Sequence, residues 1–146
     1  MNVKNLISGA KILSAVTITA GAAGTSAIES SIIDTKGFRG LMFVVLVGAV
    51  VANAVTSFKV KHGDAANLSD GLDVATTSQT IADSGDDLVK YVDIGTVRKR
   101  YYRLDISRAT QNATVAAIAV LYDPTDMPVT QVAVGEALNN PTSGTA

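Results

Sequence analysis

The stretch Leu41-Met42-Phe43-Val44-Val45-Leu46-Val47-Gly48-Ala49-Val50-Val51 decides the fold that we expect for this chain. It contains no charged or hydroxyl side chain, and valine is its commonest residue. Its eleven residues are too few to cross a bilayer as a helix, which takes about 20 apolar residues. β-Branched residues close to glycine also disfavour a helix. We therefore predict a strand buried on both faces, at the centre of a β-rich core or of a core plus an interface.

Length and composition favour one domain built from closely packed sheets. The chain has 146 residues, enough to bury about two-thirds of its unfolded surface. Hydrophobic residues make up 47% of the chain, but only 5% are aromatic and none is Trp. Cysteine is absent, which excludes disulfides, thiolate catalysis and Cys-ligated zinc.

The N-terminal segment has lysines before a mostly apolar stretch, as a signal peptide does, but the residues of that stretch are not those of a signal peptide. Lys4 and Lys11 precede the mostly apolar segment 12–24. The Thr, Ser and Gly residues of that segment are unlike an h-region, so we expect the N-terminus to be unprocessed. We expect no membrane as a partner.

Further strands are predicted where apolar and polar residues alternate. The clearest alternation is in 55–62, where Thr56, Phe58, Val60 and His62 share one face. The lysines lie on the opposite face of this strand, which we expect to be exposed to solvent. Residues 63–87 are polar and Asp-rich, and we expect a long surface excursion with a short strand or turn near Val74 or Ile81. The other predicted strands are 14–20, 26–34, 88–94, 100–107, 113–122 and an edge strand from Val129 to Gly135.

Seven or eight short strands with turns between them predict an all-β fold, a single-domain β-sandwich that is jelly-roll-like. We assign residues 1–13 to an N-terminal arm, 14–135 to the sandwich and 136–146 to a C-terminal tail. The strand 113–122 is as apolar on both faces as 41–51, so we expect the two to lie side by side or face to face. Part of their second face should be covered by a neighbouring subunit or by the arm.

The sequence offers little reactive chemistry. His62 is the only histidine, and we expect it to lie on the surface at a strand end rather than to act as a base. The Asp residues of 63–87 do not have the spacing of a calcium loop. We therefore expect no enzymatic activity, no cofactor and no metal.

The cluster Arg98-Lys99-Arg100-Tyr101-Tyr102-Arg103 mixes bases and aromatics, a combination typical of proteins that bind single-stranded nucleic acid. On a strand, however, Tyr102 would face the core, with Arg100 on the same side at the strand entrance. Tyr101 and Arg103 would face outward and pair with acids of a neighbouring strand. Because the net charge of the chain is also −1, we expect no nucleic acid as a partner.

Several short segments resemble a known family. The segment 34–45 resembles small virion proteins of tailed bacteriophages, which are encoded among the head genes and act as capsid decoration, or cement, proteins. The segments 100–104, 108–113 and 128–129 resemble this family's R-Y-x-R, T-Q-N-A and x-P-V signatures, in the same order. The likeness covers residues 14–130. From these segments we take the candidate interface residues, which are Phe38, Arg39, Tyr101, Arg103 and Val129.

The resemblance implies a β-sandwich that oligomerises, often as a trimer, on the outer capsid lattice without enzymatic activity. We therefore expect a structural virion protein, made in the host cytoplasm and located on the capsid surface, that bridges capsid subunits. Its expected partners are the major capsid protein and further copies of itself, as a homo-oligomer and trimer. Two alternatives stay open: a tail or head–tail connector component that forms rings or a tube, and a carbohydrate-binding β-sandwich module with a concave aromatic platform.

Overall fold

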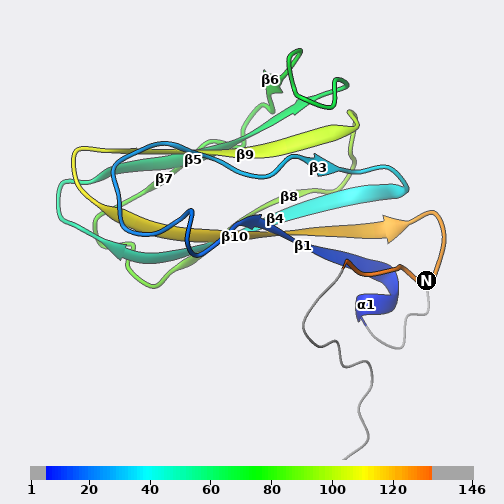
Figure 1. Ribbon diagram of the computed structural model, residues 1–146, viewed down its shortest axis with the longest axis horizontal. Helices are drawn as coiled ribbons and strands as arrows, with labels where there is room; N and C mark the ends of the chain where they lie inside the picture. The colour runs from blue at the N-terminus through cyan, green and yellow to red at the C-terminus, as the bar shows by residue number, and fades with distance from the viewer. Residues whose placement is uncertain (1–5, 133–146) are drawn as a thin grey trace, which may run out of the picture.

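The computed structural model describes residues 6–132, which form two antiparallel sheets that face each other (Figure 1). Sheet A has the strand order β1-β10-β4-β8, and sheet B has the order β2-β9-β5-β6, with β3 also on β9 and β7 on β5. The elements are α1 (Leu6–Gly9), β1 (Ala10–Val16), β2 (Ile28–Glu29), β3 (Ile33–Asp34), β4 (Phe38–Val50), β5 (Val55–Gly63), β6 (Leu72–Asp73), β7 (Gln79–Ile81), β8 (Val89–Ile94), β9 (Tyr101–Ala109) and β10 (Ala113–Pro124).

The predicted all-β, single-domain fold is confirmed, with ten strands in place of seven or eight. The number is higher because two strands are each divided into two short ones: β2 and β3 both pair with β9, and β6 and β7 both pair with β5. Counting each of these pairs as one strand leaves eight, in the orders 1-8-3-6 and 2-7-4-5. The two sheets pack face to face as a β-sandwich.

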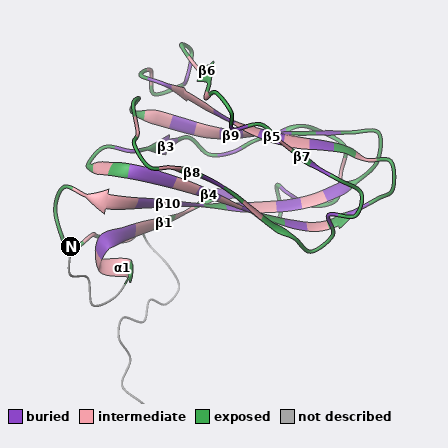
Figure 2. Cartoon of the chain, turned by 180° about the vertical axis from the view of Figure 1, so that it is seen from behind, coloured by how far each residue is buried: buried purple, intermediate pink, exposed green. Residues whose placement is uncertain are grey.

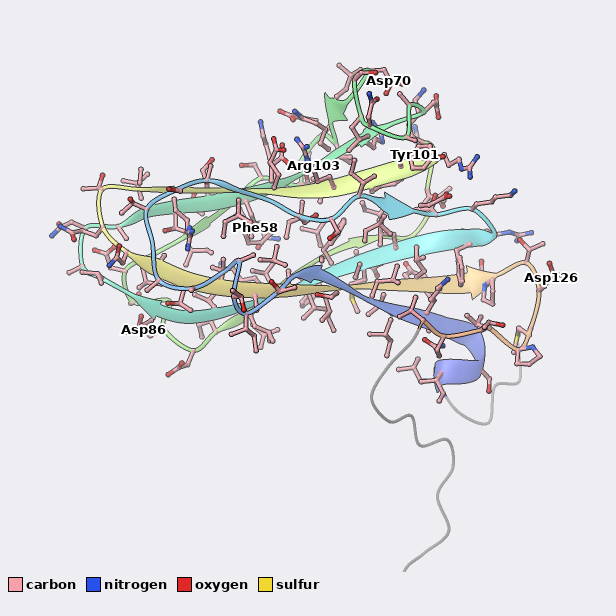
Figure 3. All side chains as sticks on the ribbon, in the orientation of Figure 1. Phe58, Asp70, Asp86, Tyr101, Arg103 and Asp126 are labelled. Atoms are coloured by element: carbon pink, nitrogen blue, oxygen red, sulfur yellow. The ribbon has the colours of Figure 1, made fainter. Side chains whose placement is uncertain are left out.

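The core lies between the sheets, where every second residue of the long strands points inward (Figure 2). In β5 and β9 the predicted alternation is confirmed, because Phe58 and Leu104 are buried while Lys59 and Arg103 face out. Figure 3 shows Phe58 between the two layers and Arg103 on the outer side of sheet B. The largest fully buried side chains are Tyr102, Phe43, Phe58, Leu41, Ile81, Leu104, Ile106 and Leu121.

The central strand β4 pairs side by side with β10, as predicted, with Phe43 opposite Ala119. The prediction that it is buried on both faces is wrong for the single chain. Leu41 and Phe43 are fully buried, but 46% of Leu46 is exposed. The reason is that sheet A has a facing layer, sheet B, on one side only. The opposite face of sheet A is also apolar, but sheet B does not cover it.

The first strand differs from the prediction at both ends. β1 begins at Ala10, four residues before the expected start, and ends at Val16, so that Ile18 is 81% exposed. The register of β1 on β10 shifts between Ser14 and Val16, and such a bulge breaks simple alternation. The chain then turns so closely past β10 that a Cβ at Gly21 would lie 1.5 Å from the Val115 carbonyl oxygen.

The polar excursion 63–87, where a short strand or turn was expected near Val74 or Ile81, carries two short strands, β6 just before Val74 and β7 ending at Ile81. The expected edge strand from Val129 is not formed in 129–132, and the rest of it lies outside the described residues, as does the tail 136–146. Val129 instead donates a main-chain hydrogen bond to Ser8, at 3.0 Å. Among the described residues, no helix is long and apolar enough to cross a membrane.

Candidate functional site

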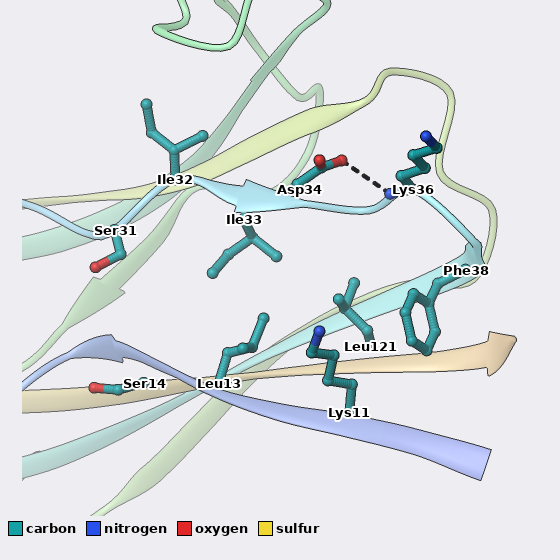
Figure 4. A pocket seen from close by; sticks show the side chains of 10 residues that line it. All are labelled: Lys11, Leu13, Ser14, Ser31, Ile32, Ile33, Asp34, Lys36, Phe38 and Leu121. Atoms are coloured by element: carbon teal, nitrogen blue, oxygen red, sulfur yellow. Dashed lines mark hydrogen bonds between the residues drawn. The ribbon is translucent and has the colours of Figure 1, made fainter. Parts of the chain in front are cut away.

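A groove runs along the side of the sandwich, where β1 of sheet A and β3 of sheet B separate (Figure 4). Its volume is about 470 Å³. The floor is apolar, with Ile33 and Leu121 buried and Phe38 partly buried. The lining residues are Lys11, Leu13, Ser14, Ser31, Ile32, Ile33, Asp34, Lys36, Phe38 and Leu121.

The groove exists because sheet B has no continuous edge strand on this side. After β2, the Ser30 N–H still donates to the Leu104 carbonyl of β9 at 2.9 Å, and the Ser30 hydroxyl accepts a hydrogen bond from the Leu104 N–H, also at 2.9 Å. The main chain leaves β9 after this residue and returns to it at β3. The Ser31 N–H donates to the Ala15 carbonyl of sheet A, also at 2.9 Å. This crossing ties the sheets together beside the groove and leaves Ile32 partly exposed at its rim.

The unpaired charges of the groove are positive. Asp34 is held by the Arg100 guanidinium, with Nε–Oδ1 and Nη2–Oδ2 distances of 3.0 and 2.8 Å. The Arg100 hydrogen bond lowers the pKa of Asp34, and the Lys36 N–H adds to the effect. Lys11 and Lys36 form no salt bridge with any described residue. With Asp34 neutralised by Arg100, a ligand meets the Lys11 ammonium group above an apolar floor, whereas the Lys36 side chain points away from the groove (Figure 4).

A second hollow of about 280 Å³ continues the groove past Phe38. Lys11 and Phe38 line both hollows, so the two adjoin. Hydrogen bonds fix the chain that closes this end, from the Thr125 N–H to the Gly37 carbonyl at 2.8 Å and from Val129 to Ser8. The other lining residues are Gly37, Pro124, Asp126, Pro128, Val129 and Thr130.

The five candidate interface residues do not form one surface. Phe38 and Val129 line the same hollow. Tyr101 and Arg103 lie on the outer face of sheet B, where Arg103 binds acids of β2 and its own strand, as predicted. Arg39 is exposed on β4.

The predicted position of Arg100 is wrong. It does not lie on the core side but is exposed, bonded to Asp34, with its guanidinium carbon 5.0 Å from the Tyr101 ring centre. Alternation misplaces it because β9 begins only at Tyr101. Lys11 was not a candidate residue, since the sequence placed it in the arm. No local pattern marks it, because residues 11–14, Lys-Ile-Leu-Ser, do not alternate between polar and apolar.

Reactive groups are sparse in the described part of the chain. His62 lies at the end of β5, but it is half-buried rather than on the surface, with its ring centre 5.4 Å from that of Tyr102 in an edge-to-face contact. Its Nδ1 has no hydrogen-bond partner there. No group of three or more His, Asp or Glu residues within 6–132 could hold a metal ion. The groove offers amines, hydroxyls and apolar surface, which suit binding.

No family model and no curated protein matches the chain. Among solved structures, the PBSX exported protein XepA is similar, with a TM-score of 0.53 and 18% identity over 97% of this chain and 46% of XepA. The SPBc2 prophage-derived protein YomS is also 18% identical, over 82% of this chain and 99% of YomS, with a TM-score of 0.47. Both neighbours are phage- or prophage-derived proteins. At this identity, the likeness to XepA shows the fold alone.

Proposed function

We propose that this chain is a structural virion protein that decorates the capsid of a tailed phage and stabilises it by bridging capsid subunits. The short family signatures support the proposal, as does the phage origin of two proteins of similar structure. The observation that carries it is the groove. Phe38 and Val129 come from signatures at opposite ends of the matched sequence, and they line one hollow.

The groove suits recognition of a partner's side chains rather than addition of a partner strand. The free edge of β1 is already occupied, since the Gln131 side chain accepts from the Ile12 N–H at 3.2 Å and donates to the Ala10 carbonyl at 2.7 Å. Capping of an edge in this way blocks pairing with another chain. The partner segment on the major capsid protein would place apolar side chains over Phe38 and a carboxylate near Lys11.

Stabilisation of the shell follows from repetition. One groove of this size gives a modest contact, but each decorated subunit repeats it over a symmetric lattice. If the protein is also joined to further copies of itself, the second binding event becomes intramolecular and the effective concentration rises. Many weak contacts then resist expansion of the capsid under the pressure of packaged DNA.

The test is a binding measurement on empty and genome-filled heads. Val129→Asp places a charge in the hollow, and we expect it to weaken capsid binding about tenfold or more, as loss of a buried contact does. Leu72→Asp is the matched control, because Leu72 is 69% exposed on β6 and lines neither hollow. A protein without capsid affinity contradicts the proposal. Ring or tube assembly without lattice binding selects the tail or connector alternative.

The aromatic side chains do not favour the carbohydrate-binding alternative. Phe43, Phe58 and Tyr102 are buried in the core. Tyr91 lies on the outer face of sheet A and Tyr101 on that of sheet B, so these two cannot stack on one sugar ring.

A further inference from the structure

The outer faces of the two sheets differ in chemistry. On sheet B, ion pairs join neighbouring strands, including Lys59 to Asp73 at 2.7 Å and Arg103 to Glu29 at 2.8 Å. On sheet A, the register aligns apolar residues across the strands, and the only charged residue in these rows is Asp93. The rows are Ile12–Val120–Met42–Asp93, Ser14–Ile118–Val44–Tyr91 and Ala116–Leu46–Val89.

This apolar face, defined by those three rows, is exposed in the single chain. Tyr91 is 63% exposed and Val89 59%. Four strands about 4.8 Å apart and three rows about 6.6 Å apart give an area of about 400 Å². Patches of this size on a monomer are often binding sites.

The area matches the centre of one protein interface. A standard interface buries about 800 Å² on each partner, of which a little over half is apolar. The face therefore supplies the apolar centre of one such contact. Its one charge, Asp93, lies at a corner of the face, in an end row on the edge strand β8, and accepts a hydrogen bond from Tyr122. The remaining residues of the three rows are uncharged, so two identical faces can pack apolar surface against apolar surface.

The face carries both a hollow and a projecting side chain. Small residues leave a hollow of about 250 Å³ beside Leu46. Tyr91 projects from β8 on the same face. In a pair of copies related by a two-fold axis, each copy presents its projecting side chain and its hollow to the same surface of the other. The hollow is lined by Ile18, Leu46, Val47, Gly48, Thr114, Val115 and Ala116.

We propose that the apolar face of sheet A joins two copies of this chain, packed face to face about a two-fold axis, with Tyr91 of each copy in the hollow of the other. The proposal rests on the self-association that the proposed function includes, and it replaces the trimer expected from the family resemblance with a two-fold pair. Two sheets packed in this way lie about 10 Å apart, like the two layers within one sandwich. The ion-paired face of sheet B stays exposed, and so does the groove.

The test measures the mass of the purified full chain by sedimentation over a range of concentrations. We expect a dimer, and we expect Tyr91→Lys and Leu46→Lys to raise its dissociation constant about 30-fold or more, as loss of a central interface residue does. Leu72→Lys, on an exposed residue of β6, should stay dimeric. Circular dichroism of each variant separates loss of pairing from loss of folding.

A cross-link gives a second readout that does not depend on weakening the contact. The chain has no cysteine, so a single introduced thiol can only join two copies. Val44→Cys lies in the middle row of the face, and a short bismaleimide should link it, whereas Leu72→Cys should stay unlinked. A monomer at every concentration overturns the proposal, as does a trimer or a dimer in which Val44→Cys is not linked. Capsid binding is scored separately, so a monomer that still binds heads overturns the pairing alone.

Discussion

The Tyr122 hydroxyl donates a hydrogen bond to the Asp93 carboxylate, and the ring of Tyr122 lies across Gly40. Tyr122 is on β10 and Asp93 on β8, with β4 between them. The contact therefore joins three strands of sheet A at one end, and it depends on the missing side chain at Gly40. Burial raises the pKa of Tyr122 to about 12, and the bond to Asp93 adds to the effect.

Gly40→Ala should destabilise the protein by about 1 to 3 kcal/mol, the usual cost of overpacking. A Cβ at position 40 would lie 2.2 Å from the Tyr122 ring, so the ring must move away from Asp93. Gly95→Ala is the control, because its Cβ would meet only the Tyr122 hydroxyl at 3.8 Å. Urea unfolding measures both. Equal stability of the two variants would contradict the role assigned to Gly40.

Tyr122→Phe should cost stability only below the pH at which the phenol ionises. A pKa raised from 10.0 to about 12 means that the contribution is fully present below pH 10 and is lost as the pH rises through 12. The free energies of unfolding of wild type and Tyr122→Phe should therefore converge between pH 10 and 12. Tyr101→Phe, which removes a hydroxyl without a hydrogen-bond partner among the described residues, should show no such convergence. A difference that stays constant to pH 12 would rule out this linkage.

The orientation of a strand could be predicted from the sequence only where one of its faces is exposed to solvent and polar. The lysines of β5 alternate with Phe58 and Val60, so period-two reasoning placed its inner face correctly. In β4 both faces are apolar, and the sequence cannot say whether a second layer or a second copy covers Leu46. The end of β1 was missed because it is set by the approach of Gly21 to Val115, 94 residues later in the chain (115 − 21).

The candidate site was predictable only in part, for a similar reason. Phe38 and Val129 were chosen from sequence signatures, but their shared hollow depends on hydrogen bonds such as that from Val129 to Ser8. The ion pair between Asp34 and Arg100 joins segments 66 residues apart. Contacts of this kind arise from pairing of β3 with β9, which no local pattern encodes.

Asp34→Asn should lower stability at neutral pH and have no effect in acid. Because Arg100 lowers the pKa of Asp34 below 3.8, the stabilisation is present above pH 3.8 and is lost as the pH falls through the lower folded-state value. Both side chains are nearly half exposed, which limits the effect at pH 7 to about 1 kcal/mol or less. The measurement is the difference in unfolding free energy between wild type and variant from pH 7 to 2. The exposed Asp126, which forms no ion pair with a described residue, gives the control Asp126→Asn. The prediction fails if the difference does not shrink in acid.

Arg108→Met should destabilise the protein by about 2 to 4 kcal/mol. The guanidinium of Arg108 is buried and donates to the main-chain carbonyls of Ser26 at 2.8 Å, Ala22 at 2.7 Å and Ala113 at 2.8 Å. Replacing a buried charge with an apolar side chain can be neutral, but here it leaves three carbonyl groups without their donor. The loop after β1 would then lose its side-chain link to β9 and keep only its main-chain hydrogen bonds to β10, from Ala113 to Gly24 and from Val115 to Gly21.

Arg108→Lys tests whether the geometry matters as well as the charge. A single ammonium group cannot reach carbonyls spread over Ala22, Ser26 and Ala113 as the planar guanidinium does, so we expect only partial rescue. Arg98→Met is the matched control, because Arg98 is exposed and its side chain has no hydrogen bond to a described residue. Thermal unfolding ranks the four proteins, with wild type and Arg98→Met highest, Arg108→Lys between and Arg108→Met lowest. Full stability of Arg108→Lys would show that the charge alone holds the loop.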